Sequence, residues 1–386
     1  MRTQSFSRYL SVVILLAIML PLGLRAQDTA YRFTTDVEVS HTSMKHQART
    51  GTCWCHATLS LLESELIRTE KGEFDLAEIF VVRHAYTDRA RLHVRLHGSS
   101  HWVPGGQAHD VIDQIRDHGI VPEHVYPGRR IGEDRLNHGE VHAVLSGMLE
   151  GIVARRGGRI TQRWPEAVES VLDVYFGKLP ETFAYEGKTY TPKSFSEHIG
   201  INPDDYIELT SYSIYPYFKS CYLEVPDNWT HNNQYYNLPL DDLERCVEHA
   251  LKNGYSLAWD GDVSERYFNI DASGACIVPA KDWETLSRAE REAKISEPVE
   301  EKEITEALRR ATFDDWTSKD DHLMHMVGLV HDQKGNTFYK IKDSYGSDRP
   351  TGGYVYFSRP YFRLKTVNVM VNKNALPSDV KARLKL

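Results

Sequence analysis

The stretch "TGTCWCHATLSLLESEL", residues 50–66, reads as the beginning of a helix that carries two cysteines at its start. Leu59, Leu62 and Leu66 recur at helical spacing, with acidic residues on the other faces. This periodicity predicts an amphipathic helix over residues 52–68. The helix begins beside the cysteines, so the first question is which of the two thiols is reactive.

A cysteine in the first turn of a helix is a candidate nucleophile, because the helix dipole and the free N–H groups stabilise its thiolate. Cys53 holds this position. Cys55 lies two residues further on, about 200° round the helix, so the two thiols cannot share one environment. We therefore predict that Cys53 is reactive and that Cys55 is dispensable.

Two residues upstream of Cys53 strengthen this hypothesis. Gln47 lies six residues before the cysteine and Gly51 lies two before it. A glutamine amide and the backbone N–H of Cys53 can converge on one point, where they would stabilise the oxyanion of an acyl-transfer reaction. Gly51 has no Cβ, so the backbone can approach a substrate closely there.

The rest of the chain changes from helical to strand patterns. Apolar periodicity predicts helices over residues 106–119 and 240–254. A densely charged stretch at 281–315 is typical of a solvated surface excursion. Alternating and β-branched runs then predict strands within 322–332, 337–346, 352–362 and 366–372. Helices first and antiparallel strands last indicate an α+β protein.

The string "QARTGTCWC", residues 47–55, resembles the signature of the papain-like cysteine peptidases, in which a glutamine precedes Gly-Ser-Cys-Trp. The resemblance implies a histidine about six residues before a strand glycine, and then an Asn-Ser-Trp-Gly segment on the next strand. His322 lies six residues before Gly328, and "KDSYG", residues 342–346, has Asp343 in the asparagine place.

The resemblance thus implies a triad of Cys53, His322 and Asp343, with Gln47 as the oxyanion donor and with no metal or organic cofactor. His325 is the rival base. It lies three residues along a strand from His322, so we expect it to face the opposite side.

Two residues depart from the family pattern. Asp343 replaces the usual asparagine, and its charge favours the imidazolium form of His322, so activity is expected to persist to higher pH. Tyr345 replaces the tryptophan that in the family shields the histidine–asparagine hydrogen bond from water. A smaller ring with a hydroxyl should shield that bond less well.

The separation between Cys53 and His322 is 322 − 53 = 269 residues, far above the roughly 130–150 of simple papain-like enzymes. This length, and strings at 105–128 and 235–265, resemble the bleomycin hydrolase and aminopeptidase C branch. The branch implies a papain-like α+β fold with large insertions. A helical left subdomain and an antiparallel, barrel-like β right subdomain would share a cleft for peptide substrates.

The branch also implies substrate contacts. Gly105 and Gly106 would line the non-primed side of the cleft and pair with the substrate backbone, with Trp54 beside them. Relatives are usually aminopeptidases, because a C-terminal arm brings its carboxylate to the substrate's amino group, and they commonly form hexameric rings. The end of this chain, "VNKNALPSDVKARLKL" at 371–386, does not match that tail. Exopeptidase and endopeptidase action, and the hexamer, therefore stay open.

The first residues have the features of a secretory signal peptide. Arg2 and Arg8 precede an apolar run that ends at small Ala26. We predict export to the periplasm or the outside of a bacterium, with no membrane attachment after the signal is removed. The expected organisation is a signal peptide at 1–26 and one peptidase domain at 27–386, with a helical part mainly at 50–280, a charged insertion at 281–315, a β-rich part at 316–375 and a C-terminal arm at 376–386.

Composition excludes other classes. The formal net charge of −8 argues against nucleic acid or an anionic membrane as a partner, because both reward a basic surface. The five cysteines show no paired spacing of the kind that holds structural zinc, so no metal site is expected. Two other hypotheses stay open, namely a peptide-binding protein without catalysis on the same scaffold and an acyltransferase such as a transglutaminase.

Overall fold

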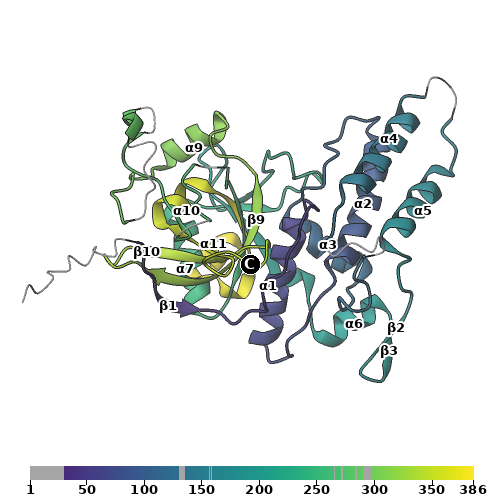
Figure 1. Cartoon of the computed structure of the whole chain (residues 1–386), viewed down its shortest axis with the longest axis horizontal. Coiled ribbons are helices and arrows are strands. Elements are labelled where there is room, and N and C mark those ends of the chain that lie inside the picture. Colours follow the sequence, from purple (N-terminus) through teal and green to yellow (C-terminus); the bar gives the residue numbers. More distant parts are fainter. Residues whose placement is uncertain are drawn as a thin grey trace, which may run out of the picture.

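The computed structural model describes residues 30–129, 135–155, 157, 159–264, 266–270, 273–282, 285–289 and 297–386. The predicted signal peptide at 1–26 and parts of the charged stretch lie outside the described residues. In Figure 1 a sheet with its own helices lies on the left, a group of helices lies on the right, and helix α1 (Cys53–Arg68) lies between them. This arrangement confirms the predicted α+β class.

The helical part packs around α1. Its members are α2 (Glu78–Arg95), α3 (Ala108–His118), α4 (Gly139–Val153), α5 (Trp164–Phe176) and α6 (Pro192–Ile199), with the hairpin of β2 (Phe183–Tyr185) and β3 (Lys188–Tyr190). The helices predicted at 52–68 and 106–119 are confirmed as α1 and α3. The backbone N–H of Gln107 donates to Asp110 Oδ2 (2.9 Å) at the start of α3, and Gly119 ends that helix with φ +80°.

The sheet joins segments from nearly the whole chain. Its strands are β1 (Thr34–Glu38), β4 (Tyr206–Thr210), β5 (Lys219–Cys221), β6 (Tyr235–Asn237), β7 (Leu257–Gly261), β8 (Ala275–Cys276), β9 (His322–His331), β10 (Thr337–Lys342), β11 (Tyr354–Ser358) and β12 (Thr366–Asn372). Among the described residues their order is β5-β6-β4-β12-β7-β9-β10-β11-β8, and β1 also pairs with β9. Strands β4 to β8 thus lie inside the stretch that was expected to be mainly helical.

Helices and short turns cover the sheet. They are η1 (Pro203–Asp205), α7 (Leu240–Lys252), α9 (Glu306–Asp314), α10 (Arg359–Lys365), η3 (Lys373–Ala375) and α11 (Ser378–Leu384). α7 confirms the helix predicted at 240–254. Residues 376–386, expected as a C-terminal arm, contain α11, whose Val380 and Leu384 are buried in the same core as α7. Arg245 of α7 also pairs with Asp379 (2.7 Å).

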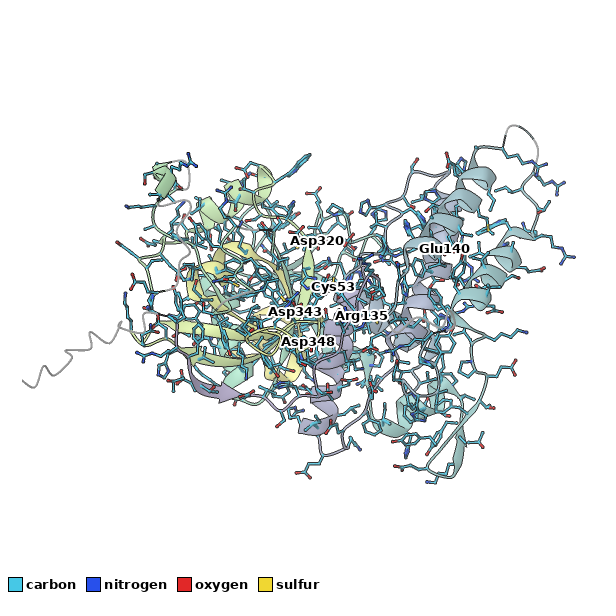
Figure 2. The ribbon with its side chains drawn as sticks, in the orientation of Figure 1. Cys53, Arg135, Glu140, Asp320, Asp343 and Asp348 are labelled. Atoms are coloured by element: carbon cyan, nitrogen blue, oxygen red, sulfur yellow. The ribbon has the colours of Figure 1, made fainter. Side chains whose placement is uncertain are left out.

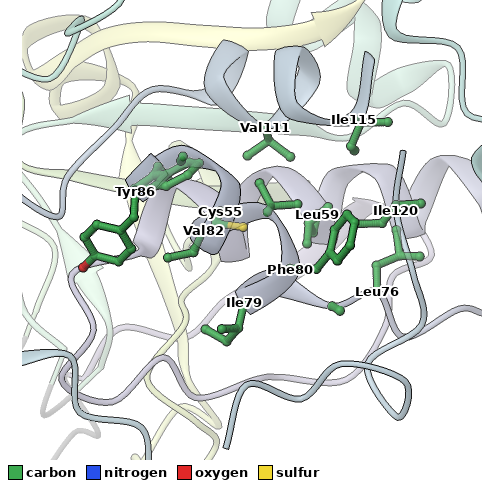
Figure 3. Close-up of a cluster of buried hydrophobic side chains, with 14 of the residues drawn as sticks. Cys55, Leu59, Leu76, Ile79, Phe80, Val82, Tyr86, Val111, Ile115 and Ile120 are labelled. Atoms are coloured by element: carbon green, nitrogen blue, oxygen red, sulfur yellow. The ribbon is translucent and has the colours of Figure 1, made fainter. Parts of the chain in front are cut away.

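The core on the helical side forms where α1, α2 and α3 meet, and Figure 3 shows Leu59 of α1 among Phe80, Val82 and Val111. A second core packs α7, α10 and α11 against the sheet. α1 is buried over most of its surface because it lies between the helices and β9. Through these contacts α1 joins the helical half of the molecule to the half that contains the sheet.

Glu63 of α1 differs from the expectation that acidic residues lie on a polar face, because this side chain is fully buried. Thr42 Oγ1 (2.6 Å), Lys45 Nζ (2.9 Å) and the backbone N–H of Leu76 (2.9 Å) all donate to its carboxylate. A buried charge is tolerated when it is paired and fully hydrogen-bonded. The pattern of the sequence could not reveal partners that come from a separate loop.

Two further predictions are corrected. The run 352–362 was expected to be one strand, but β11 ends at Ser358, whose Oγ accepts from the N–H of Tyr361 (3.1 Å) and begins α10. The charged stretch was expected to be solvated, but Arg309 of α9 is buried. Its guanidinium donates to the carbonyl oxygens of Ser211 (2.7 Å) and Arg363 (2.8 Å). Within the described ranges, no helix combines the length and the hydropathy needed to cross a bilayer.

We expect Leu59→Ala to lower the free energy of unfolding by about 2–5 kcal/mol, because its fully buried side chain would leave a cavity that neighbours fill only partly. Urea denaturation followed by circular dichroism measures the change. Val174→Ala, at a position of α5 that is 72% exposed, is the control and should change it by less than about 0.5 kcal/mol. Equal effects of the two substitutions would contradict this packing.

Candidate active site

Cys53 is the first residue of α1 and is buried. The N–H groups of the first turn have no partner within a helix, so the thiol lies beside free donors and the positive end of the helix dipole. Gly51, two residues before it, adopts φ +67° and lies so close to Pro104 that an added Cβ would come within 2.9 Å of the Pro104 Cβ. The turn that leads into the cysteine therefore requires glycine.

His322 is the first residue of β9 and lies between Cys53 and Asp343. Its Nε2 bonds Asp343 Oδ1 at 2.9 Å, and the same ring also forms a side-chain hydrogen bond with Cys53. Because Nε2 is engaged by the carboxylate, Nδ1 is the nitrogen that remains for the thiol. Figure 2 shows Cys53 and Asp343 close together where the two halves of the molecule meet. The structure thus brings the three predicted residues into one hydrogen-bonded line.

The charges in this line stabilise one another. Burial alone would lower the pKa of His322, but the Cys53 thiolate and the Asp343 carboxylate raise that pKa to about 10. Burial alone would raise the pKa of Asp343, but the hydrogen bond and charge of His322, together with the N–H of Ser344 and the guanidinium of Arg349, lower it. The imidazolium form of His322 is therefore favoured at neutral pH.

Tyr345 and Arg349 cover this line from the solvent side. The Tyr345 ring stacks on His322 with centroids 5.7 Å apart, and the Arg349 guanidinium lies 5.3 Å from the Tyr345 ring centre. Arg349 Nη1 also donates to Asp343 Oδ2 at 2.9 Å. The tyrosine, expected to shield poorly, is thus supplemented by an arginine that no motif in the sequence indicated.

Gln47 is buried, and its amide is held in one orientation. Ser344 Oγ donates to Gln47 Oε1 at 2.6 Å, while Gln47 Nε2 donates to the Tyr345 hydroxyl at 3.3 Å. The backbone N–H of Gln47 also donates to the Ser344 carbonyl at 2.7 Å. The amide NH₂ therefore faces the side that holds Tyr345 and His322, where an oxyanion donor is needed. Ser344, which sequence analysis missed, fixes this orientation.

The predicted substrate-binding residues differ in accessibility. Trp54 is almost fully buried, and its indole N–H donates to the Pro104 carbonyl at 3.0 Å. It therefore supports the loop that carries Gly105 and Gly106, and its predicted contact with substrate stays a prediction. Gly105 is partly exposed, but its carbonyl accepts a hydrogen bond from Arg89. Gly106 is buried.

The two rival residues lie elsewhere. Cys55 is fully buried, its thiol donates to the Glu78 carbonyl at 3.4 Å, and burial raises the pKa of this thiol well above its usual value. His325 was expected to face the side opposite to His322. Its Nδ1 bonds Ser60 Oγ of α1 at 2.8 Å, two turns of helix from Cys53. It faces α1 but is not part of the hydrogen-bonded line.

The described part of the chain contains no group of three His, Cys, Asp or Glu side chains placed to hold a metal ion. All five cysteines are buried and carry free thiols. The chemistry that the described side chains can supply is therefore nucleophilic attack by a thiolate, proton transfer by an imidazole and stabilisation of an oxyanion.

Comparison with known proteins finds similarity to peptidases. A family model described as "Peptidase C1-like family" matches residues 170–386. Aminopeptidase G of Lactobacillus delbrueckii subsp. lactis is 22% identical over 399 residues, which cover 90% of this chain and 84% of the relative. Bleomycin hydrolase of Gallus gallus is 22% identical and covers 92% and 86%. The crystal structure of PepW from Lactobacillus rhamnosis superimposes with a TM-score of 0.67 at 19% identity, over 91% of this chain and 84% of that chain.

We expect Asp343→Asn to lower the pKa of His322 by about 1–3 from its value of about 10, because removal of the carboxylate charge favours the neutral imidazole. NMR titration of the protein labelled with ¹⁵N-histidine measures this pKa directly. Asp348→Asn, which removes an exposed charge on the same loop, is the matched control and should leave it unchanged. An unchanged titration of His322 in Asp343→Asn would contradict the assigned contact.

Proposed function

The chain belongs to the Peptidase C1-like family and is a cysteine peptidase of the papain-like aminopeptidase C and bleomycin hydrolase branch, and from that premise we propose its catalytic residues. Cys53 is the nucleophile, His322 the base and acid, Asp343 the residue that orients His322, and Gln47 an oxyanion donor. The observation that carries this proposal is the hydrogen-bonded line from Cys53 through His322 to Asp343.

The proposed reaction uses a thiolate–imidazolium pair. The Cys53 thiolate attacks the peptide carbonyl carbon, and the C–O π pair moves to oxygen, where the Gln47 amide and the Cys53 N–H stabilise it. The intermediate then expels the amine, which takes the proton from His322. Water attacks the thioester, His322 accepts a proton from that water, and the thiolate leaves. Asp343 holds the ring in place through both steps.

We further propose that the enzyme removes residues from the N-terminus of peptides. Curated relatives that match 89–93% of this chain are named aminopeptidases or bleomycin hydrolase. An endopeptidase on the same scaffold would use the same triad but would need a cleft that accepts chain on both sides of the scissile bond.

We expect wild-type enzyme to shorten a long synthetic peptide one residue at a time from its N-terminus, and Cys53→Ala to leave the peptide intact because it lacks the thiolate. Time-resolved mass spectrometry of the digest measures both. Cys55→Ala is the matched control, since this buried thiol lies two residues away and does not contact His322. It should retain the wild-type pattern.

The outcomes separate the parts of the proposal. Turnover by Cys53→Ala would refute the assigned nucleophile. Internal cuts by the wild type, at a rate that exceeds trimming, would refute the aminopeptidase assignment while leaving the triad in place.

We also propose that the enzyme acts outside the cytoplasm, in the cell envelope of a bacterium. The support is the charged, apolar and small-residue pattern of residues 1–26. Expression of the full chain in a bacterium with a secretion pathway should yield a mature protein that begins at Gln27 in the periplasm or medium. N-terminal sequencing after cell fractionation checks this, and an uncleaved N-terminus in the cytoplasm would contradict it.

A further inference from the structure

Three carboxylates, which we call the acidic wall, lie near Cys53. They belong to Asp227, Asp260 and Asp320. The Asp227 carboxylate lies so close to Gly105 that a Cβ added to that glycine would overlap with it. Because Trp54, which follows Cys53, bonds the Pro104 carbonyl, the acidic wall lies on the Gly105 side of the nucleophile.

The positions of two of these residues follow from the sheet. In the pairing of β7 with β9, Gly261 lies opposite His322. Asp260 is the residue before Gly261, so it lies next to the position opposite His322. Asp320 lies two residues before His322 in the chain. In Figure 2 Asp320 and Asp343 are labelled on opposite sides of Cys53, so Asp320 lies apart from the carboxylate that bonds His322.

Neutral amides hold the two carboxyls in place. Gln107 Nε2 donates to Asp320 Oδ2 at 3.0 Å, and Asn368 Nδ2 donates to Asp260 Oδ2 at 2.8 Å. The same Asn368 nitrogen also donates to Gln107 Oε1 at 2.8 Å, which fixes the orientation of the Gln107 amide. Asp260 and Asp320 are close enough to form a hydrogen bond with one another.

Among the described residues, no lysine, arginine or histidine forms a salt bridge with Asp260 or Asp320. Asp260 is fully buried, and its Oδ1 accepts no hydrogen bond from an amide, amine or hydroxyl of the described residues. The groups that act most strongly on Asp260 and Asp320 are other acids and the amide of Gln107. At the outer end the Arg89 guanidinium acts on Asp227, and His101 Nε2 lies 3.5 Å from Asp227 Oδ1.

Burial of neighbouring carboxyls without a cation costs free energy, which a bound cation would offset. Two carboxyls in contact cannot both ionise in a buried site. Asp260 and Asp320 therefore share one proton and carry one negative charge between them. Burial raises the pKa of both groups well above the usual value, in agreement with this sharing. An organic ammonium group has one positive charge and three donors, which match the single charge and the free oxygens of the pair.

We propose that Asp260 and Asp320 bind the free α-ammonium group of the peptide substrate and so position its first residue over Cys53. The α-nitrogen is two bonds from the carbonyl carbon of that residue, so an aminopeptidase must hold it close to the nucleophile. This proposal rests on the proposed function and gives it a structural basis. Asp227, which is more exposed, lies at the entrance of the same site.

The end of the described chain does not occupy this place. Leu386 lines a separate pocket together with Ile112, Arg116, Tyr206 and Lys373, and none of the catalytic residues lines that pocket. The acidic wall therefore does not depend on the carboxylate of Leu386. A second source of an ammonium group is a lysine side chain of the substrate, at the second residue before the scissile bond. The test separates this source from the α-ammonium group.

The test compares hydrolysis of alanyl-aminomethylcoumarin with that of its N-acetylated form, by wild type and by Asp320→Asn. Asp321→Asn is the matched control, because it removes the same charge from an exposed neighbour whose carboxylate bonds the Ser264 N–H at 2.9 Å. In Asp320→Asn we expect kcat/KM for the free-amine substrate to fall about 10- to 100-fold, mainly through KM, with the acetylated substrate unaffected. Asp321→Asn should behave as wild type.

A second measurement does not need turnover. Alaninamide should protect Cys53 from alkylation by iodoacetamide in the wild type, whereas acetyl-alaninamide should not, and Asp320→Asn should lose this difference. Equal protection by the two amides in wild type, or unchanged selectivity in Asp320→Asn, would overturn the proposal. A preference for acetyl-lysyl-alanyl over acetyl-leucyl-alanyl substrates that Asp320→Asn abolishes would also overturn it, because the group bound would then be a lysine side chain.

These results are distinct from failure of the proposed function. If Cys53→Ala still hydrolyses the free-amine substrate, the triad is wrong. If Cys53 is required but Asp320→Asn keeps the wild-type ratio between free and acetylated substrates, only the ammonium site is wrong. Alkylation of Cys53 at the wild-type rate shows that a variant has kept its fold.

Discussion

The packing of α1 against β9 is the contact on which the rest of the structure depends. Cys53 begins α1 and His322 begins β9, so the proposed catalytic pair exists only while these two elements stay in register. Ser60 stabilises the contact from within, because its hydroxyl bonds both His325 Nδ1 and Lys342 Nζ at 2.8 Å. A buried hydrogen bond that joins a helix to two strands leaves little freedom for sliding. The positions of the proposed nucleophile and base are therefore set by a polar contact inside the apolar interface.

Sequence patterns predicted the elements that bear this contact, because their signals are local. The leucines of α1, the apolar face of α3 and the β-branched runs of β9 and β12 each follow one period. The boundary at Ser358 was missed because the change from strand to helix depends on a single cap. The burial of Glu63 and Arg309 was missed because their partners come from distant segments. A sequence does not show whether a charged side chain is solvated or is buried with hydrogen-bonding partners.

The same limit applies to the site. A motif places Cys53 and Gln47, since the spacing near a helix start is short, and a resemblance was needed to choose His322 and Asp343. Arg349 and Ser344 belong to no motif, although one pairs with Asp343 and the other fixes Gln47. Asp260 and Asp320 lie on different segments, and only the pairing of β7 with β9 brings them together. Strand order, which one sequence does not reveal, brings these two acids side by side.

The sheet also has a consequence for the newly made chain. β9 lies between β7 and β10 and also pairs with β1, so this central strand cannot be placed until ribosomes have synthesised most of the protein. Pairings between such distant segments form slowly. During that interval Cys53 has no histidine within reach, so under the proposed mechanism the nascent polypeptide is inactive. The pairing of distant strands thus delays the approach of Cys53 and His322 until translation and folding are nearly finished.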